Sequence, residues 1–217
     1  MQWPRRGHAA LAPVTLMNLA TVSVQCGSRP GIDPAFEGAA RELGSALVSA
    51  NLSVVYGGMA TGLMGFLADS VLEQGGRIVG VIPRFLNKAG LRHEGLAELH
   101  VVKTMEERKS LMLDLADATI VLPGGVGTMD EFWEVLAGAQ LEQHSKPCGL
   151  LNISGYYDSL LAFMDRALRE GLISLSDKNN VIVGDNSKVL IERLFEAVAV
   201  TRLPALRDSR REERAKS

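Results

Sequence analysis

Three glycine-rich segments of this sequence have the composition of phosphate-binding turns. They are residues 26–29 (CGSR), 56–65 (YGGMATGLMG) and 123–131 (PGGVGTMDE), and each follows a short apolar run. Glycine permits positive φ and lets a phosphate approach the backbone N–H groups closely. A helix that starts after such a turn adds its unpaired amides and its dipole, so an anion site is predicted. The expected binding residues are Gly27, Ser28, Gly58, Gly124, Gly125, Gly127 and Thr128.

Two common nucleotide-binding motifs are absent from these turns. No turn ends in Gly-Lys-Ser/Thr, which disfavours a Walker-type NTPase, and the first turn is not G-x-G-x-x-G, so the dinucleotide fingerprint is missing. Ordinary turn chemistry explains any single glycine turn. Three such turns at strand ends of one sheet favour a site for a mononucleotide.

The elements that position these turns alternate between strand and helix along nearly the whole chain. Apolar runs predict strands at 21–25, 53–56, 78–82, 99–102, 119–122, 148–152 and 181–183. Amphipathic stretches predict helices at 34–50, 63–74, 105–116, 129–141, 157–170 and 188–198. This alternation predicts an α/β, Rossmann-like single domain with a doubly wound parallel sheet of six or seven strands. Ser187 is expected to cap the last helix and Gly171 to follow the end of the one before it.

Composition excludes several other classes of protein. The 217 residues, 47% hydrophobic and 22% charged, suit one globular domain. A net charge of −2 gives no general attraction to nucleic acid or to an anionic membrane. Two cysteines and four scattered histidines have neither the pattern of a disulfide framework nor metal-ligand spacing. We therefore expect a cytoplasmic protein with no metal site and no nucleic-acid or membrane partner.

The catalytic domain is expected at residues 21–200, between an N-terminal extension (1–20) and a charged C-terminal tail (201–217). An arginine pair precedes an apolar stretch near the start, as in a secretion signal, but a proline and an asparagine interrupt it and no small-residue cleavage site follows. A disordered extension, or a start at Met17, is the favoured interpretation. The tail is rich in charge and poor in apolar groups, so we expect it to be solvated.

The third turn is similar to the PGGxGTxxE signature of the Lonely Guy family, the cytokinin-activating phosphoribohydrolases. Residues 123–128 read PGGVGT, and Glu131 follows at the expected distance. Upstream, the chain resembles that family's Met/Arg-Lys/Met helix at Met105, Arg108, Lys109 and Met112. The turns at 26–28 and 62–65 match in order, so the resemblance covers about residues 21–194. It departs at Met59, where the family commonly has a third glycine.

The resemblance implies a Rossmann-like fold, a homodimer, and hydrolysis of a nucleotide substrate, a cytokinin ribotide, to free base and ribose 5-phosphate. It also implies that no pyridoxal phosphate is used, and no lysine stands in an obvious Schiff-base context. We expect no cofactor. By the same resemblance Met105 and Lys109 join the substrate-binding residues, although Lys109 also fits a plain surface charge.

Cleavage of a base–ribose bond builds positive charge on the sugar, as in glycoside cleavage. Such a site needs a carboxylate to stabilise that charge or to activate water, and donors to hold the phosphate. We predict Glu131 as the catalytic carboxylate, with Glu134 and Asp130 as supporting or solvent-facing groups. Arg108 lies on a mainly apolar helix face and offers a planar, permanently charged fork, so we predict it as the second catalytic residue. Complementing the helix dipole is the alternative role for these acidic residues.

Two other functions stay open at this point. A broader glycosidase acting on AMP and other nucleoside monophosphates would use the same turns. A nucleotide- or cofactor-binding module without catalysis would also use them, but it would have no need of the carboxylate.

Overall fold

Seven parallel strands form one sheet in the computed structural model, which describes the backbone of residues 19–215 and the side chains of residues 19–201. The strands are β1 (Thr21–Gln25), β2 (Ser53–Tyr56), β3 (Ile78–Pro83), β4 (Glu98–Val102), β5 (Ala118–Val121), β6 (Cys148–Leu151) and β7 (Val181–Gly184). Their order is β4-β3-β2-β1-β5-β6-β7, and every neighbouring pair is parallel. The predicted doubly wound α/β sheet is confirmed, with strand ends shifted by at most one residue.

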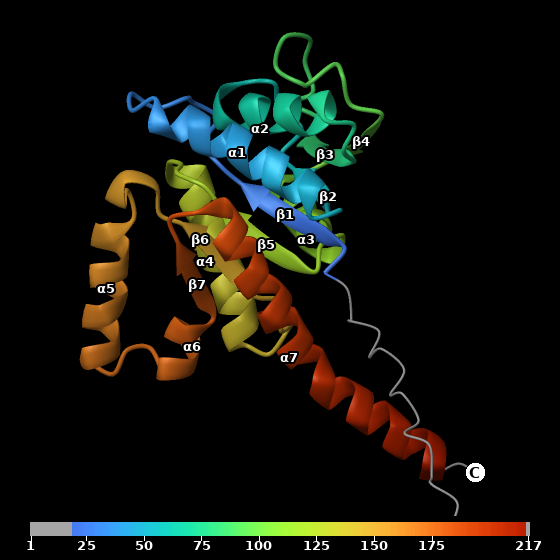
Figure 1. Cartoon of the computed structure of the whole chain (residues 1–217), viewed down its shortest axis with the longest axis vertical. Coiled ribbons are helices and arrows are strands. Elements are labelled where there is room, and N and C mark those ends of the chain that lie inside the picture. Colours follow the sequence, from blue (N-terminus) through green and yellow to red (C-terminus); the bar gives the residue numbers. More distant parts are fainter. Residues whose placement is uncertain (1–18, 216–217) are drawn as a thin grey trace, which may run out of the picture.

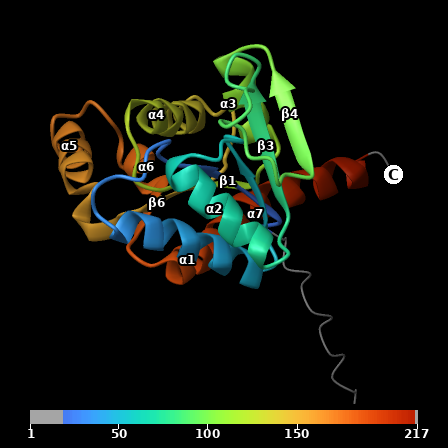
Figure 2. The same ribbon diagram turned by 90° about the horizontal axis from the view of Figure 1, so that it is seen from above.

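Helices cover both faces of this sheet. They are α1 (Ala35–Ser49), α2 (Gly62–Glu73), α3 (Met105–Asp114), α4 (Val126–Gln140), α5 (Asp158–Arg169), α6 (Leu175–Asn179) and α7 (Ser187–Ala215), with a short 3-10 helix η1 (Ile153–Gly155). In Figure 2, α3 and α4 lie on one side of the sheet and α1 and α2 on the other, where α7 packs against α1. The chain winds outward from β1 to β4 and then returns to place β5 beside β1 (Figure 1). The strand order therefore reverses between β1 and β5, where open α/β sheets bind their ligands.

The core explains why the central strands read as continuous apolar runs. Successive side chains of a strand point to opposite faces, and both faces of this sheet are covered. Val22 and Val24 of β1 belong to the larger core with Leu43 of α1, while Val121 of β5 packs into a second core with Phe132 of α4. Every residue of β5 is buried.

Most predicted helix starts lie within one residue of the observed ones, but two predictions about helix starts are wrong. Helix α4 begins at Val126 rather than at residue 129, so Gly127 and Thr128 lie in its first turn. The predicted capping role of Ser187 is wrong, because the backbone N–H of Val189 donates to Oδ1 of Asn186 at 3.0 Å, one residue earlier. Ser187 is instead buried as the first residue of α7. The Gly171 prediction is confirmed, with φ of 72° just after α5.

The predictions for the two ends of the chain have different outcomes. Residues 1–18 of the predicted extension (1–20) lie outside the described residues. Helix α7 continues to Ala215, well past the predicted end at residue 198, so most of the predicted tail (201–217) has a helical backbone. Arg, Glu, Ala and Leu, which dominate this segment, are good helix formers despite their charge. The unpredicted helix α6 starts with a capping box between Ser174 and Asp177.

None of the helices within residues 19–215 is both long enough and apolar enough to cross a membrane.

Gly62 joins the first two glycine turns. Its φ of +58° is left-handed, and a Cβ there would lie 2.4 Å from the carbonyl carbon of Ser28 and from the amide nitrogen of Arg29. The next residue, Leu63, donates its N–H to the carbonyl of Gly27 at 3.0 Å. Only glycine satisfies both the backbone angle and this close approach, so the turns after β1 and β2 keep a fixed relative position.

This packing predicts that Gly62→Ala is much more destabilising than Gly75→Ala. Gly75 has a similar φ of +70° but no atom within 4 Å of an added Cβ. Gly75→Ala should therefore cost only the left-handed backbone strain, about 1–2 kcal/mol, whereas Gly62→Ala adds a backbone clash and should cost about 3–4 kcal/mol. Urea unfolding measures both. Equal losses in the two variants would show that the Ser28 backbone yields freely.

Candidate active site

A cleft of about 640 Å³ opens at the carboxyl ends of the central strands, at the switch point in strand order. The three glycine turns converge on it, as predicted. Most of the predicted site residues line it, namely Gly27, Ser28, Met105, Arg108, Gly124, Gly125, Gly127, Thr128 and Glu131. Gly58 and Lys109 do not.

One end of the cleft is formed by the start of α4. Gly125 is its N-cap residue, and the first main-chain bond of the helix runs from the N–H of Met129 to the carbonyl of Gly125 at 3.0 Å. The amides of the preceding helical residues therefore have no partner within the helix and are available to an anion. Gly27 donates its N–H to the carbonyl of Pro123 at 3.0 Å, which ties the first turn to this one.

A buried ion pair faces the same cleft. Nη1 of Arg108 on α3 donates to Oε1 of Glu131 on α4, and the two residues are only 7% and 8% exposed. Nε of Arg108 donates to the carbonyl of Val81 in β3 at 3.1 Å. The guanidinium is thus held by two elements, and it fixes the carboxylate beside the unpaired amides of α4.

Gly57 makes room for this arginine. A Cβ at Gly57 would lie 2.2 Å from Nη2 of Arg108 and 2.8 Å from Sδ of Met64. The second glycine turn therefore does more than approach a ligand: its first glycine lets the guanidinium lie against the end of β2.

The start of α3 sets the direction from which Arg108 enters. Oγ1 of Thr104 accepts the N–H of Glu107 at 3.2 Å, and the carboxylate of Glu107 accepts the N–H of Lys103 at 2.7 Å. These bonds satisfy two amides at the helix entrance, much as a capping box does. They fix the first turn of α3, one residue before Arg108.

Burial and charge act in opposite directions on the catalytic candidate. Desolvation raises the pKa of the Glu131 carboxyl above its ordinary value of 4.5 and is the largest influence. The positive charge of Arg108 and its hydrogen bond act to lower that pKa, and the neighbouring Asp130 raises it. The carboxylate is therefore a poorly solvated anion that depends on Arg108 for its stabilisation.

The two predicted residues outside the cleft have other contacts. Nζ of Lys109 pairs with Oδ2 of Asp130 at 2.9 Å and with Oε2 of Glu134, both on α4. The carbonyl of Gly58 accepts the N–H of His93 at 3.0 Å, which attaches the loop between β3 and β4 to the second turn. Lys109 thus links α3 to α4, and Gly58 supports a wall of the site.

Sequence reasoning missed several residues that line the cleft. Phe36 of α1 and Tyr156 after η1 form an edge-to-face pair with centroids 5.4 Å apart, and the Tyr156 hydroxyl donates to the carbonyl of Gly124 at 2.7 Å. Leu86 comes from the turn after β3. No motif marks these residues; only the convergence of the strand ends brings them to the cleft.

Cys26 and the histidines offer no alternative chemistry. The Cys26 thiol is buried, and burial, with the nearby Glu131 charge, raises its pKa far above the ordinary range, so it stays protonated. Within residues 19–215 there is no group of three or more histidine, cysteine or acidic side chains arranged to hold a metal ion.

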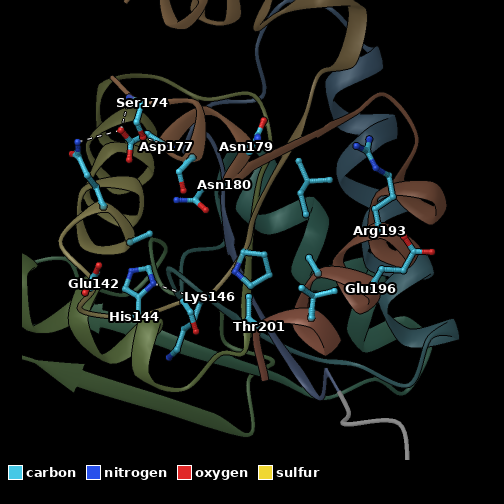
Figure 3. Close-up of a pocket in the computed structure, with 18 residues that line it drawn as sticks. Glu142, His144, Lys146, Ser174, Asp177, Asn179, Asn180, Arg193, Glu196 and Thr201 are labelled. Carbon is cyan, nitrogen blue, oxygen red and sulfur yellow. Dashed lines mark hydrogen bonds between the residues drawn. The ribbon is translucent and has the colours of Figure 1, made fainter. Parts of the chain in front are cut away.

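A larger hollow, about 1050 Å³, lies at the opposite ends of the strands, where β6 and β7 begin. Figure 3 shows Lys146, two residues before β6, and Asn180, directly before β7, across the hollow from Arg193 and Glu196 of α7. The amino ends of strands border this hollow, and its charged side chains are of both signs. It has neither the glycine turns nor the start of α4, so the smaller cleft is the better nucleotide site.

Comparison with known proteins identifies the family of this chain. Residues 64–194 match the family model described as "Possible lysine decarboxylase". The cytokinin riboside 5′-monophosphate phosphoribohydrolase of Rhodococcoides fascians is 47% identical over 75% of this chain and 83% of its own length. The Arabidopsis thaliana enzyme LOG1, of the same name, is 42% identical over 82% of this chain and 83% of its own.

Solved structures confirm the fold at lower identity. The molybdenum cofactor binding protein of Rippkaea orientalis superposes with a TM-score of 0.63 over 84% of this chain and 99% of its own, at 18% sequence identity. The molybdenum cofactor carrier protein of Chlamydomonas reinhardtii gives 0.61 over the same shares of the two chains, at 19% identity. These likenesses concern the architecture alone, whereas the sequence relatives share most of the chain at more than 40% identity. The chain belongs to the family of the cytokinin riboside 5′-monophosphate phosphoribohydrolases.

Proposed function

We propose that this protein hydrolyses the N-glycosidic bond of cytokinin riboside 5′-monophosphates, and of AMP, to free base and ribose 5-phosphate. The observation that carries the proposal is the buried Arg108–Glu131 pair, which faces the same cleft as the unpaired amides of α4. A nucleoside monophosphate fits both groups. The amides can bind its phosphate, and the carboxylate can stabilise the positive charge that develops on the sugar carbon during cleavage. The names of the sequence relatives support the same reaction.

The geometry supports a division of roles. The start of α4 and the turn at Gly27 and Ser28 hold the 5′-phosphate, which places the sugar towards Glu131. Ionised Glu131 stabilises the positive charge that develops on the ribose and orients the attacking water. Arg108 keeps the carboxylate ionised and fixed in position, and its remaining N–H groups are available to the substrate.

The base end of the site is apolar. Met59, Leu86 and Met105 each lie three residues beyond the end of β2, β3 and β4 respectively, and they line the cleft on the β4 side of the phosphate turns. Such a surface accepts the flat face of a purine and an attached hydrocarbon chain through burial of apolar area. Base release from isopentenyladenosine monophosphate, AMP, GMP and CMP would measure how far the substrate range extends.

Catalysis fits this site better than binding alone. A protein that only held a nucleotide would not need a buried carboxylate beside an anionic ligand, because burial of that charge is costly and it repels the phosphate. Here the carboxylate is buried and paired with Arg108. We propose the protein as an N-glycosyl hydrolase that needs no cofactor.

We also propose a cytoplasmic homodimer whose interface involves α3 and α4 and borders the cleft. Trp133 of α4 is 38% exposed and stacks edge-to-face with Phe163, itself 59% exposed. Leu115 at the end of α3 is also exposed. Large exposed aromatic side chains of this kind are enriched in protein interfaces.

Light scattering tests the dimer. We expect a mass of about twice 23.4 kDa at micromolar concentration, and Trp133→Glu should shift the protein towards the monomer by placing a charge in an apolar interface. Val189→Glu is the matched control, because Val189 is 49% exposed but lies on α7, on the opposite face of the sheet from α3 and α4. A wild-type monomer would contradict the proposal.

Glu131→Gln should abolish most turnover while the protein stays folded. Glutamine keeps an oxygen to accept the Arg108 N–H but has no negative charge, so the rate of base release from AMP should fall about 10²–10³-fold. Nucleotide binding should persist because the phosphate amides are unchanged. Glu192→Gln on α7 makes the same chemical change at an exposed position remote from the cleft and should be fully active. Base release and melting curves are measured for both variants, and near-normal turnover of Glu131→Gln would refute the catalytic role.

Gly127→Ala should weaken phosphate binding without harming the fold. Gly127 is helical and lines the cleft, and an added Cβ has no described neighbour within 4 Å, so the methyl group would occupy ligand space. We expect KM for AMP to rise about tenfold or more, the equivalent of 1.4 kcal/mol or more, with the melting temperature unchanged or raised. Gly38→Ala in α1 also meets open space, but outside the cleft, and should leave KM unchanged. An unchanged KM in Gly127→Ala would place the phosphate elsewhere.

A further inference from the structure

A second, much smaller cavity also borders Glu131. Its volume is about 20 Å³, and Glu131 is the one residue that lines both this cavity and the cleft. Gln25 at the end of β1, Lys109 of α3 and Glu134 of α4 provide its other polar walls. A cavity needs roughly 10–15 Å³ to hold a water molecule, so this one has room for one water and for no larger ligand.

Three polar groups at this cavity have unused hydrogen-bonding capacity. Gln25 is only 5% exposed, and its Oε1 has no hydrogen-bond partner among residues 19–201. The ammonium group of Lys109 has three N–H donors and uses two, on Asp130 and Glu134. Arg108 donates to Oε1 of Glu131, and within the described residues no group donates a hydrogen bond to Oε2.

These three groups form a complete set for one water molecule. Water donates two hydrogen bonds and accepts others, and buried waters typically make about three. One O–H can reach an acceptor on Gln25 and the other an acceptor on Glu131, while the water oxygen accepts from Lys109. Without such a water the Gln25 oxygen would be a buried, unsatisfied acceptor, which destabilises a fold.

We propose that this cavity binds one structural water, which bridges Gln25 Oε1, Lys109 Nζ and Oε2 of Glu131. Gln25 and Lys109 are then positioning residues for the carboxylate, acting through the water. The proposal rests on the proposed function only in giving Glu131 a catalytic role. It also accounts for Lys109, which the cleft itself does not use.

The bridge stabilises the ionised form of Glu131. A water that donates to a carboxylate favours its charged state, and so counters the desolvation that raises the pKa of this group. The charged or titratable groups that face Glu131 are Arg108 and Lys109 from α3, Asp130 and Glu134 from its own helix and the Cys26 thiol next to β1. None of these groups donates a hydrogen bond to Oε2 within the described residues, so the water has a distinct role.

The sign of the pH dependence follows from the ionised carboxylate being the active form. Activity is lost as the pH falls through the pKa of Glu131. Removing the donor to Oε2 raises that pKa, so the acid limb of the rate profile moves to higher pH. One lost hydrogen bond to a charged group corresponds to a shift of about one pH unit.

Gln25→Met is the variant that tests this bridge, because methionine matches the length of glutamine but offers no strong acceptor to the water. Crystal structures of the wild type and the variant are compared, together with kcat for AMP as a function of pH. We expect a water within hydrogen-bonding distance of Gln25 and Glu131 in the wild type and not in the variant, and an acid limb about one pH unit higher in Gln25→Met.

The matched control is Thr119→Val. Thr119 of β5 is also a buried residue whose side-chain oxygen has no partner within the described residues, but it lines neither the cavity nor the cleft. Its replacement should leave the pH profile in place. A dry cavity in the wild-type crystal, or a Gln25→Met profile that overlays that of the wild type, would overturn the proposal.

Failure of the proposed function has a different signature. Full activity of Glu131→Gln would remove the catalytic role of the carboxylate, while the electron density in the cavity would still decide whether the water site exists. A water present in the wild type, together with an unshifted Gln25→Met profile, would overturn the positioning role and leave the reaction assignment intact.

Discussion

The need to bury a charge pair shapes this molecule more than any other constraint. A guanidinium and a carboxylate removed from water are tolerated only when they are matched to each other and to further hydrogen bonds. Arg108 meets this condition through Glu131 and the carbonyl of Val81, and it can do so only because Gly57 has no side chain. The end of β2, the strand β3 and the starts of α3 and α4 must therefore all be placed correctly for one ion pair to exist.

The same pair explains why the site can stabilise positive charge. A carboxylate in water is already well solvated and gains little from an approaching cation, whereas the Glu131 carboxylate has lost most of its hydration. Its field acts in surroundings of low dielectric constant, where electrostatic interactions are strong and little reorganisation is needed during the reaction. Protonation of the buried acid would be the obvious escape, and the charge and hydrogen bond of Arg108 act against it. Burial thus strengthens the field of the carboxylate, and pairing with Arg108 stabilises its charge.

Much of this arrangement could be predicted from the sequence, because short-range patterns determine it. Apolar runs located the strands to within one residue, and the spacing in residues 123–131 placed Glu131 in the first two turns of α4. The sequence could not separate the roles of Arg108 and Lys109. They are neighbours on one helix, and only the packing of α3 on α4 sends one into the core and the other to Asp130 and Glu134. The capping choice between Asn186 and Ser187 and the arrival of Tyr156 at the cleft likewise depend on tertiary contacts.

The position of Arg108 in the chain also bears on how the protein folds. This residue lies on the segment that crosses from the edge strand β4 to the centre of the sheet at β5. Its partners are Val81, 27 residues earlier, and Glu131, 23 residues later. The pairing of β1 with β5, which creates the switch point under the cleft, joins residues as far apart as Val22 and Ala118. The entropy of closing a loop grows with its length, so this strand pairing, rather than the ion pair, carries the larger entropic cost of assembling the site.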